Sequence, residues 1–560
     1  MTTSVRASKQ QQHTKSQHEQ QQQQQQQQQT ETTIKDDNKN GKGNYNFKSF
    51  LLILFSAILI RIILFYQGFD QLFSNRNEIT TPLTSFKRLV EGLHLRELGL
   101  SPYAGSAYHQ PPLVLLLFYP FVNSINISNN NNNSGDGNNY LIFGIFEKSQ
   151  ILFLIIDCII AIVLREIAKQ IPRVLPKEMK PISANSNLPN ITAALYLFNP
   201  FTIFTCIGMS TINLTNLAIV LSLYYSLKGM IFQSVFSVAM ASYLSIYPVV
   251  LIFPCALILK HHFFPPQQTQ PVAQNQLPSD QSKQLKQLLE RNERPMLLLF
   301  YFRILIFFLL SISSLFYLSF TFLNSWEFFE KSYKFTFFVE DLTPNIGLFW
   351  YYFIEVFDHF RNLFLFIFQY HVFIYCIPLA IRLKDHPLFY FWSLCAIIAT
   401  FKSYPALGDT ALHVSLLPLL YQPLKGVKYS FIVIVVAIFV TVLAPILWQM
   451  WIYQGTGNAN FYYTINLVFT IAQVLLIVDS LSVLLKLDYV NKINLKNKLL
   501  ENNQIEQQQQ QQQHQQEKEK EQQEKEQQEE QQDEKTDLES SSQKIDDNNN
   551  ENNSEENEEK

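Results

Sequence analysis

The chain has 560 residues, a formal net charge of −3 and a mean hydropathy of +0.01, averages that are typical of a soluble protein. These averages combine two unlike materials, because Gln, Asn, Glu and Lys dominate residues 1–46 and 490–560 while the chain between them is strongly apolar. Segments so poor in apolar surface cannot offset the entropy lost on folding, so we predict two disordered tails around a polytopic transmembrane domain at 47–489.

Charge and cysteine usage exclude several classes of protein. Residues 501–560 hold 20 acidic and 6 basic residues, so the rest of the chain is net basic. The five cysteines all lie in apolar runs without C-x-x-C spacing and are expected to be small buried hydrophobes. No Gly-rich phosphate loop, G-x-S-x-G or H-E-x-x-H motif occurs. We therefore expect no catalytic residues, no metal site, no cofactor and no nucleic-acid partner.

Apolar segments suited to crossing a bilayer recur along the whole central domain, at 1.5 Å of helix per residue. The first has no small-residue cleavage site and is expected to stay as an uncleaved anchor. The fifth and sixth are short and contain Pro248 and Pro254, and one tilted helix is an alternative for this pair. The prediction is an all-α membrane protein of about twelve spans, near residues 48–66, 145–166, 191–208, 212–228, 231–247, 248–260, 296–320, 362–382, 387–403, 410–423, 429–449 and 461–486.

Clusters of Lys and Arg give the orientation, because positive residues near the ends of spans stay in the cytosol. Four loops are rich in Lys and Arg, near residues 165–180, 260–294, 382–384 and 425–428. All four can lie in the cytosol only if the chain crosses the membrane an even number of times between them. With twelve spans, both tails are then also predicted to be cytosolic. The apolar run Pro111 to Val122 would invert this pattern, and about 12 residues of helix cover only about 18 Å. We predict that this run is a re-entrant or interfacial helix on the lumenal side.

A few ionisable residues fall inside or beside the spans, where burying charge is costly. Asp157 and Asp479 are expected either to bind a neighbouring helix or to face a substrate, and Arg61 is expected to reach the interface. Glu355, Asp358 and His359 are expected to share one helix face at the lipid head groups. Four basic residues ahead of the seventh span are candidates for binding anionic lipids: Lys283, Lys286, Arg291 and Arg294.

The long stretches predicted to be lumenal carry most of the unusual polar sequence, at residues 67–144, 321–361 and 450–460. A metal-dependent glycosyltransferase that uses a lipid phosphate needs two acids close together to hold a divalent cation. In the first of these stretches Asp70 and Glu78 stand alone. The sequence therefore lacks the acidic pair that such a transferase requires.

Several longer runs resemble one known family, the class U subunit of glycosylphosphatidylinositol (GPI) transamidase, or PIG-U. The resemblance covers roughly residues 50–490 and omits both tails. It is carried by Thr81–Leu93 with Leu98–Gly105, by Asp341–Trp350 with Ile377–Pro387, by Phe401–Pro405 with Gly408-Asp409, and by Trp448–Tyr453 with Asn458–Phe461.

That family is similar to the polytopic mannosyltransferases of the GPI pathway, which implies a glycosyltransferase-C-like helix bundle. Those enzymes carry an acid-x-acid motif where this chain reads Glu78-Ile79-Thr80-Thr81. The resemblance implies a non-catalytic subunit in the endoplasmic reticulum that holds the GPI lipid. A cysteine-protease-like partner subunit would then perform the transamidation.

The candidate contacts with the GPI lipid are polar residues expected at the lumenal rim: Asp341, Thr343, Asn345, His359, Arg361, Lys402, Tyr404, Asp409, Asn458 and Asn460. The alternative is an active polytopic mannosyltransferase with Asp70 or Glu78 as its base. A transporter is disfavoured because the two halves show no matching broken helices.

Overall fold

The architecture is all-helical. A computed structural model describes residues 47–131, 148–174, 187–264, 279–420 and 424–551. Within these ranges the chain forms helices and a single isolated antiparallel bridge, between Ser85 and Ser210. The chain divides into two compact units, Met1–Leu481 and Ser482–Lys560, and the first of these holds the membrane helices.

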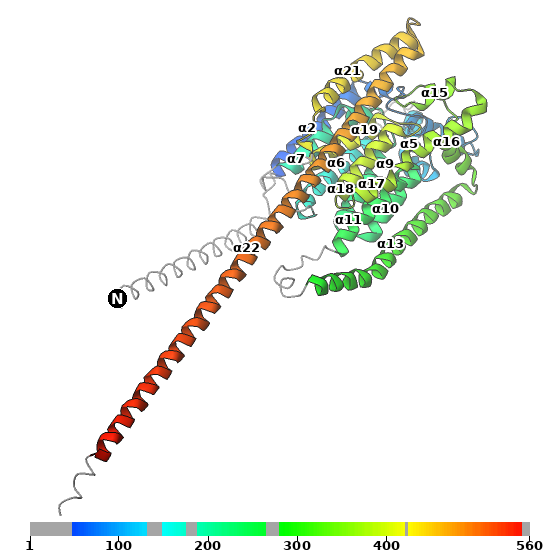
Figure 1. The fold of residues 1–560 in the computed structure, drawn as a ribbon. Helices are drawn as coiled ribbons and strands as arrows, with labels where there is room; N and C mark the ends of the chain where they lie inside the picture. Colours follow the sequence, from blue (N-terminus) through cyan, green and yellow to red (C-terminus); the bar gives the residue numbers. More distant parts are fainter. Residues whose placement is uncertain (1–46, 132–147, 175–186, 265–278, 421–423, 552–560) are drawn as a thin grey trace, which may run out of the picture. The chain divides into compact units, whose positions relative to one another are not determined.

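The helices of the first half of the chain pack against one another. Helix α9, for example, contacts both α6 and α10 (Figure 1). Their bounds are α2 Phe47–Tyr66, α3 Phe69–Phe73, α4 Phe86–Glu97, α5 Pro112–Asn131, α6 Lys148–Val174, α7 Leu188–Leu197, α8 Pro200–Ile207, α9 Ile212–Leu227, α10 Ile231–Leu244, the 3₁₀ helix η2 Tyr247–Leu251, and α11 Ile252–Phe263.

The second half begins with a long helix that packs along α10. The bounds are α13 Ser279–Leu323, the π-helix η3 Phe329–Lys334, α14 Phe335–Phe338, α15 Phe349–Glu355, α16 Asp358–Ile374, α17 Cys376–Arg382, α18 Pro387–Phe401, α19 Leu407–Leu416, the 3₁₀ helix η4 Leu417–Leu420, α21 Ser430–Trp448, the π-helix η5 Gln449–Tyr453, and α22 Ala459–Glu551.

The centre of the first unit is α18, which packs against α11 and α19. Every residue of α18 from Leu388 to Thr400 is buried. A helix that is apolar on all sides is stable only where other helices surround it. Helices α2, α13, α16 and α21 instead lie at the periphery and expose large apolar side chains, as Leu52, Leu298, Phe366 and Phe431 do. Such faces are suited to lipid, which confirms an all-α polytopic membrane protein.

Among the described residues, five helices are long and apolar enough to cross a membrane on their own, and a sixth span results if the bent pair α7 and α8 is counted together. Six further apolar helices have 10–17 residues, among them α9, α10 and α18. The helices thus occur at the predicted places, but twelve complete crossings are not confirmed. The shortfall has a physical cause: short helices are viable where neighbouring protein, rather than lipid, covers their ends.

Two breaks explain why some predicted spans are divided. Asn199 accepts a hydrogen bond from the backbone N–H of Phe201 and caps α8, whose first residue is Pro200, so the segment 191–208 bends by 50° there. Ser245 has extended backbone angles (φ −152°, ψ 139°) and separates α10 from η2. The single tilted helix considered for 231–260 is therefore wrong.

Helix ends that are predicted to lie on the same side of the membrane contact one another, while the sides themselves stay a prediction. At the ends predicted to be cytosolic, a ring nitrogen of His261 lies 3.4 Å from the Lys384 carbonyl, and Arg165 donates to Asn190. The ends predicted to be lumenal meet around a cavity described below. We call this second region the cavity end of the bundle; it holds residues 67–111, 208–215, 244–247, 324–348 and 402–409.

Arg61 does not reach the interface as predicted, because it is 1% exposed and pairs with Asp157 at 2.5 Å. Asp157 also accepts a hydrogen bond of 2.6 Å from Tyr196. Asp157 thus joins three helices, α2, α6 and α7. Asp479 likewise binds a neighbouring helix, since it accepts from the backbone N–H groups of Lys428 and Tyr429 at the start of α21.

The common face predicted for Glu355, Asp358 and His359 is wrong. Val356 and Phe357 are extended (ψ 137° and 139°), so α15 ends at Glu355 and α16 begins at Asp358. The spacing rule for one helix cannot apply across this break.

Two predictions about the surface remain open. The run predicted to be re-entrant is the first part of α5, whose Val114, Leu115 and Phe118 are buried while Leu116 and Leu117 are exposed. The first tail lies outside the described residues. In the second tail α22 continues as helix to Glu551, since Gln, Glu and Lys are good helix formers. The predicted disorder of this polar tail in solution stays a prediction.

Candidate functional site

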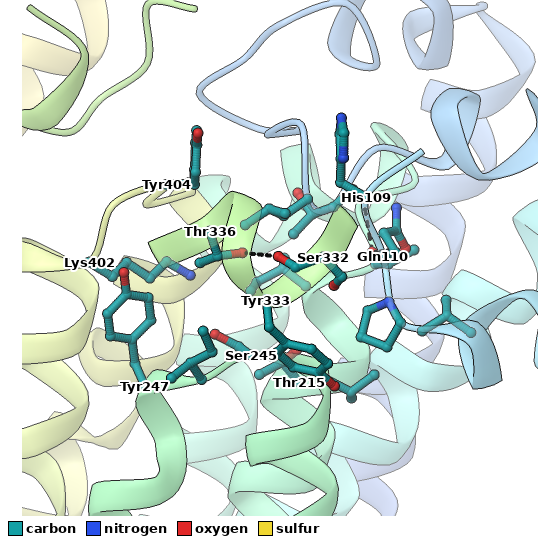
Figure 2. A pocket seen from close by; sticks show the side chains of 18 of the residues that line it. His109, Gln110, Thr215, Ser245, Tyr247, Ser332, Tyr333, Thr336, Lys402 and Tyr404 are labelled. Atoms are coloured by element: carbon teal, nitrogen blue, oxygen red, sulfur yellow. Dashed lines mark hydrogen bonds between the residues drawn. The ribbon is translucent and has the colours of Figure 1, made fainter. Parts of the chain in front are cut away.

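A polar cavity lies at the cavity end of the bundle (Figure 2). Six segments that are far apart in the sequence line it, with residues from 83–84, 109–114, 211–215, 244–247, 332–336 and 402–404. The space measures about 620 Å³, including the part open to solvent.

Backbone breaks bring polar side chains to the cavity. Tyr247 begins η2, directly after the Ser245 break, and its hydroxyl donates to Gln369 at 2.8 Å. The same hydroxyl accepts from the backbone N–H of Ser403, just past the end of α18. Gln369 in turn donates to the carbonyl of Thr336, at 3.2 Å. This network fixes α14, α16 and the segment after α18 relative to one another.

Lys402 is the cation of the cavity. It follows the last residue of α18 in an extended conformation (φ −70°, ψ 159°) and is 5% exposed. Its ammonium lies 2.6 Å from Asp409, and the Asp409 carboxylate also accepts from the backbone N–H of Ala406 at the start of α19. In Figure 2 the Lys402 side chain extends toward Thr336 across the cavity. Asp409 itself is not among the lining residues.

Two rings that line the cavity, His109 and Tyr404, both stack on Phe335, which lies beside it. The ring of His109 stacks on Phe335 with centroids 3.6 Å apart, and Phe335 stacks on Tyr404 at 5.8 Å. Both ring nitrogens of His109 face backbone carbonyls, Nδ1 at 2.8 Å from Lys331 and Nε2 at 2.9 Å from Ser106. Burial nevertheless lowers the pKa of His109 below its usual value, and it raises the pKa of the Tyr404 hydroxyl.

Gln110 connects the segment between α4 and α5 to Ser85, before α4, and to Thr211, at the start of α9. Its amide nitrogen donates to the carbonyl of Ser85 at 2.8 Å, and its amide oxygen accepts from Thr211 at 3.0 Å. Its backbone carbonyl accepts from Tyr103 at 2.6 Å. With only 1% of its surface exposed, Gln110 is a fully satisfied buried amide.

The predicted contacts Asp341, Thr343 and Asn345 build a turn beside the cavity. Asp341 accepts from the backbone N–H and the hydroxyl of Thr343, and it pairs with Arg88 at 3.4 Å. Asn345 accepts from the N–H of Gly347 at 2.7 Å. The backbone N–H and carbonyl of Asp341 both bind the Tyr404 hydroxyl, so this turn packs directly on the lining segment.

The other predicted contacts do not line the cavity. Arg361 donates to the carbonyls of Phe338 and Val339 at the end of α14. His359 is exposed on α16. Asn458 accepts from the N–H of Phe461 at the start of α22, and exposed Asn460 accepts from the Tyr351 hydroxyl.

The basic cluster predicted to bind anionic lipids falls largely outside the described side chains. Lys283, Lys286 and Arg291 belong to α13, but their side chains are not among those described. Arg294 is exposed on the same helix. Binding of anionic lipids by these four residues stays a prediction.

Neither lone acid of the first lumenal stretch lines the cavity. Glu78 is 7% exposed and accepts a 2.7 Å hydrogen bond from Tyr462, and its backbone carbonyl accepts from Leu407 at 2.8 Å. Asp70 accepts from Gln150 at 3.4 Å. Among the described residues no group of three or more His, Cys, Asp or Glu is placed to hold a metal ion.

Of the ten predicted lipid contacts, the structure thus places Lys402 and Tyr404 in the cavity wall, and Asp409 and Asp341 directly behind it. Sequence reasoning missed the lining residues His109, Gln110, Thr215, Ser332 and Thr336. The signal for the first two was their place directly before Pro111-Pro112, at the start of an apolar helix. The hydroxyl residues gave no signal, because Ser and Thr are frequent in membrane helices.

Comparisons with known proteins agree on one family. The family model described as GPI transamidase subunit PIG-U matches residues 55–469. The chain is 34% identical over 454 residues to the GPI-anchor transamidase component PIGU of Mus musculus, which covers 78% of this chain and 94% of that protein. It is 29% identical over 448 residues to the GPI transamidase component GAB1 of Saccharomyces cerevisiae, covering 80% of this chain and 96% of that protein.

Proposed function

Because this chain belongs to the family of GPI transamidase subunit PIG-U, we propose that it is a non-catalytic subunit of a GPI transamidase complex. Its task is to hold the GPI lipid at the lumenal face of the endoplasmic reticulum. A cysteine-protease-like subunit would form the acyl-enzyme and pass it to the lipid's ethanolamine. Holding a large amphiphile near a reactive acyl group raises the effective concentration of the nucleophile.

The observation that carries this proposal is the position of Glu78. By the resemblance described above, this acid would stand where the mannosyltransferases carry two acids; in the structure its carboxylate is buried and accepts a hydrogen bond from Tyr462 of α22. A catalytic base has to reach the proton that it removes, directly or through one water. Glu78 instead connects the first lumenal stretch to α19 and α22, which favours a structural role over an acid–base role.

The cavity supports a binding role. It combines a buried cation, several hydroxyls and an apolar floor that includes Val114, Ile212 and Leu244. Such a combination suits the junction between a polar head group and acyl chains. Of the other predicted rim residues, His359, Asn458 and Asn460 are exposed and available to glycan hydroxyls.

The rival is an active mannosyltransferase with Asp70 or Glu78 as base. Under the proposal, Glu78→Gln keeps an oxygen that accepts from the Tyr462 hydroxyl, so GPI attachment is retained. Asp70→Asn likewise keeps an oxygen that accepts from Gln150, and GPI attachment is again retained. Under the rival, one of the two variants abolishes mannose transfer and a truncated glycolipid accumulates. Glu78→Leu is the matched control: it removes the hydrogen bond as well as the charge, so it lowers the amount of folded protein under either hypothesis.

Depletion of the chain tests the whole proposal. Cells that lose it should accumulate complete GPI lipid while their GPI-dependent proteins keep uncleaved carboxy-terminal signals. Co-purification should recover a cysteine-protease-like subunit. Recovery of the chain without such a partner, or accumulation of a truncated glycolipid, would overturn the proposal.

We also propose that both tails face the cytosol and that the basic residues at the start of α13 contact anionic phospholipids. The support is the distribution of Lys and Arg along the sequence. Protease protection of tags placed at either end of the chain in sealed microsomes tests the orientation. Digestion of both tags from outside is the expected result.

A further inference from the structure

Helix α13 carries a cation in the middle of an apolar stretch. Every residue from Met296 to Leu310 other than Arg303 is Met, Leu, Ile, Phe or Tyr. The part of the helix from Arg294 to Leu323 is long and apolar enough to cross a membrane. A charge inside such a span is costly, so it usually has a partner there and marks a functional position.

The described part of the chain does not supply this partner. Arg303 is exposed, and among the described residues its guanidinium makes no ion pair and no hydrogen bond. The interaction found for it is with the ring of Phe307, whose centroid lies 5.3 Å from the guanidinium carbon. By contrast, Arg61 pairs with Asp157, and Asp479 accepts from two backbone N–H groups. Arg303 is thus a charge in a span whose partner has to come from outside these residues.

The direction of the Arg303 side chain disfavours lipid head groups as that partner. Helix side chains tilt toward the N-terminus, and a basic side chain near that end of a span reaches the interface by extending the same way. The guanidinium of Arg303 instead lies over Phe307, one turn further from the start of α13. Leu298 and Leu299 precede Arg303 and are 74% and 67% exposed. Placing Arg303 among the head groups would therefore move these two leucines into water, which is unfavourable.

The residues around Arg303 form one continuous surface on the outside of the bundle. Exposed residues recur at spacings of three or four and so share one side of α13. Beside them, the ring of Phe307 packs against exposed Phe232 of α10, with centroids 6.2 Å apart. We call this surface the Arg303 face; it consists of Phe232, Leu299, Arg303, Ile306, Phe307 and Leu310.

From its charge and its surroundings we infer that the Arg303 face docks a transmembrane helix of another subunit, and that this helix carries an Asp or Glu at the depth of Arg303. A carboxylate accepts strong hydrogen bonds from a guanidinium, often two at once. Apolar residues of the docked helix would pack on Leu299 and Leu310. The inference rests on the proposed function for the presence of other subunits, and it goes further by naming where one of them binds.

Photo-crosslinking in the assembled complex identifies the occupant. The full-length, tagged chain replaces the native chain in its own cells, with the photo-reactive residue benzoylphenylalanine in place of Leu310, and the membranes are irradiated before purification. The expected product joins position 310 to the transmembrane segment of a co-purified subunit, within one helical turn of an Asp or Glu. Leu298 is the matched control position, because it is also exposed on α13 but does not belong to the Arg303 face; it should not give this product.

Charge variants test the role of Arg303 itself. Arg303→Leu should lower the amount of the cross-linked subunit that co-purifies with the chain about 3- to 10-fold, and Arg303→Glu about 10-fold or more. Arg303→Lys keeps the charge and should keep most of the recovery. Replacing the cross-linked acid by Lys should restore recovery with Arg303→Glu, because the ion pair then forms with its signs exchanged. Leu298→Ala should leave recovery unchanged.

Loss of docking can be separated from loss of folding. Since Arg303 has no partner among the described residues, Arg303→Leu should not lower the melting temperature of the purified chain. Unchanged recovery of every subunit with folded Arg303→Leu and Arg303→Glu would overturn the inference. Cross-links from position 310 to lipid alone would also overturn it, and would assign the guanidinium to a lipid phosphate. The proposed function fails separately, if the unaltered chain recovers no partner subunit at all.

Discussion

The ion pair between Arg61 and Asp157 should be one of the strongest single determinants of stability in the first unit. Both side chains are almost fully buried, at 1% and 0% exposure, and the two groups lie 2.5 Å apart. Asp157→Leu leaves the Arg61 guanidinium without its counter-charge inside the bundle. Removing one member of a buried pair typically costs about 3–5 kcal/mol, and we expect a loss of this size in the free energy of unfolding.

The double variant Arg61→Leu with Asp157→Leu should be much less destabilised than either single variant. It removes both charges together, and apolar replacements of similar volume are often close to neutral. A residual loss of about 1 kcal/mol is expected, because the carbonyl of Leu197 then loses the hydrogen bond of 2.9 Å from Arg61. Tyr196→Phe removes one hydrogen bond to the carboxylate and should cost about 1.5–3 kcal/mol.

Equilibrium unfolding of the purified chain in mixed micelles with rising dodecyl sulfate, followed by tryptophan fluorescence, measures these differences. The double-mutant cycle gives the coupling energy between the two residues. Additive effects of the two single substitutions would refute the reasoning, since they would mean that the charges do not stabilise each other.

Three further outcomes follow from the structure. Asp479→Ala removes the acceptor for two backbone N–H groups at the start of α21 and should cost about 1–2 kcal/mol, with Asp479→Asn intermediate in the same unfolding assay. Gly408→Ala should cost about 1–3 kcal/mol, because its new Cβ would lie 2.6 Å from Ile212; Ala411→Gly on the same helix should be milder, and equal losses would contradict this account. Burial lowers the pKa of His109, so between that lowered value and about 6.5 the unfolded chain binds more protons, and stability should fall as the pH drops below about 6.5. The melting temperature of His109→Gln should depend less on pH over 7.5–5.5, and an unchanged pH slope would refute this assignment.

The sequence predicts most helices because the length of an apolar run and its flanking charges are local properties. The run that becomes α18 and the run that becomes α2 are both recognisable from composition alone. The break at Val356 is not, because this position does not carry the Gly or Pro that usually marks the end of a helix, whereas Pro248 indicates the break that the structure places at Ser245. Their extended conformations depend on the segments that pack against them.

The site was only partly predictable for a related reason. Lys402 and Tyr404 were found because polar residues directly after an apolar run are conspicuous. Pairing of Arg61 with Asp157 depends on α2 lying beside α6, which no spacing within either helix indicates. Thr215 and Ser332 line the same cavity only because the fold brings α9 and η3 to it, so their common position is a property of the tertiary structure.

The groups that could carry a proton beside the cavity are engaged by other groups, which supports the proposed non-catalytic role. Acid–base chemistry needs a group with a free position that takes up or releases a proton beside the substrate. At the described cavity wall, the one imidazole, His109, has both nitrogens within hydrogen-bonding distance of carbonyls. The nearby carboxylate of Asp409 is occupied by Lys402 and by the N–H of Ala406. The hydroxyls of Thr215, Ser245 and Ser332 line the cavity without a hydrogen bond to another described residue. A hydroxyl becomes a strong nucleophile only beside a group that removes its proton, so their position is in line with the proposed non-catalytic role.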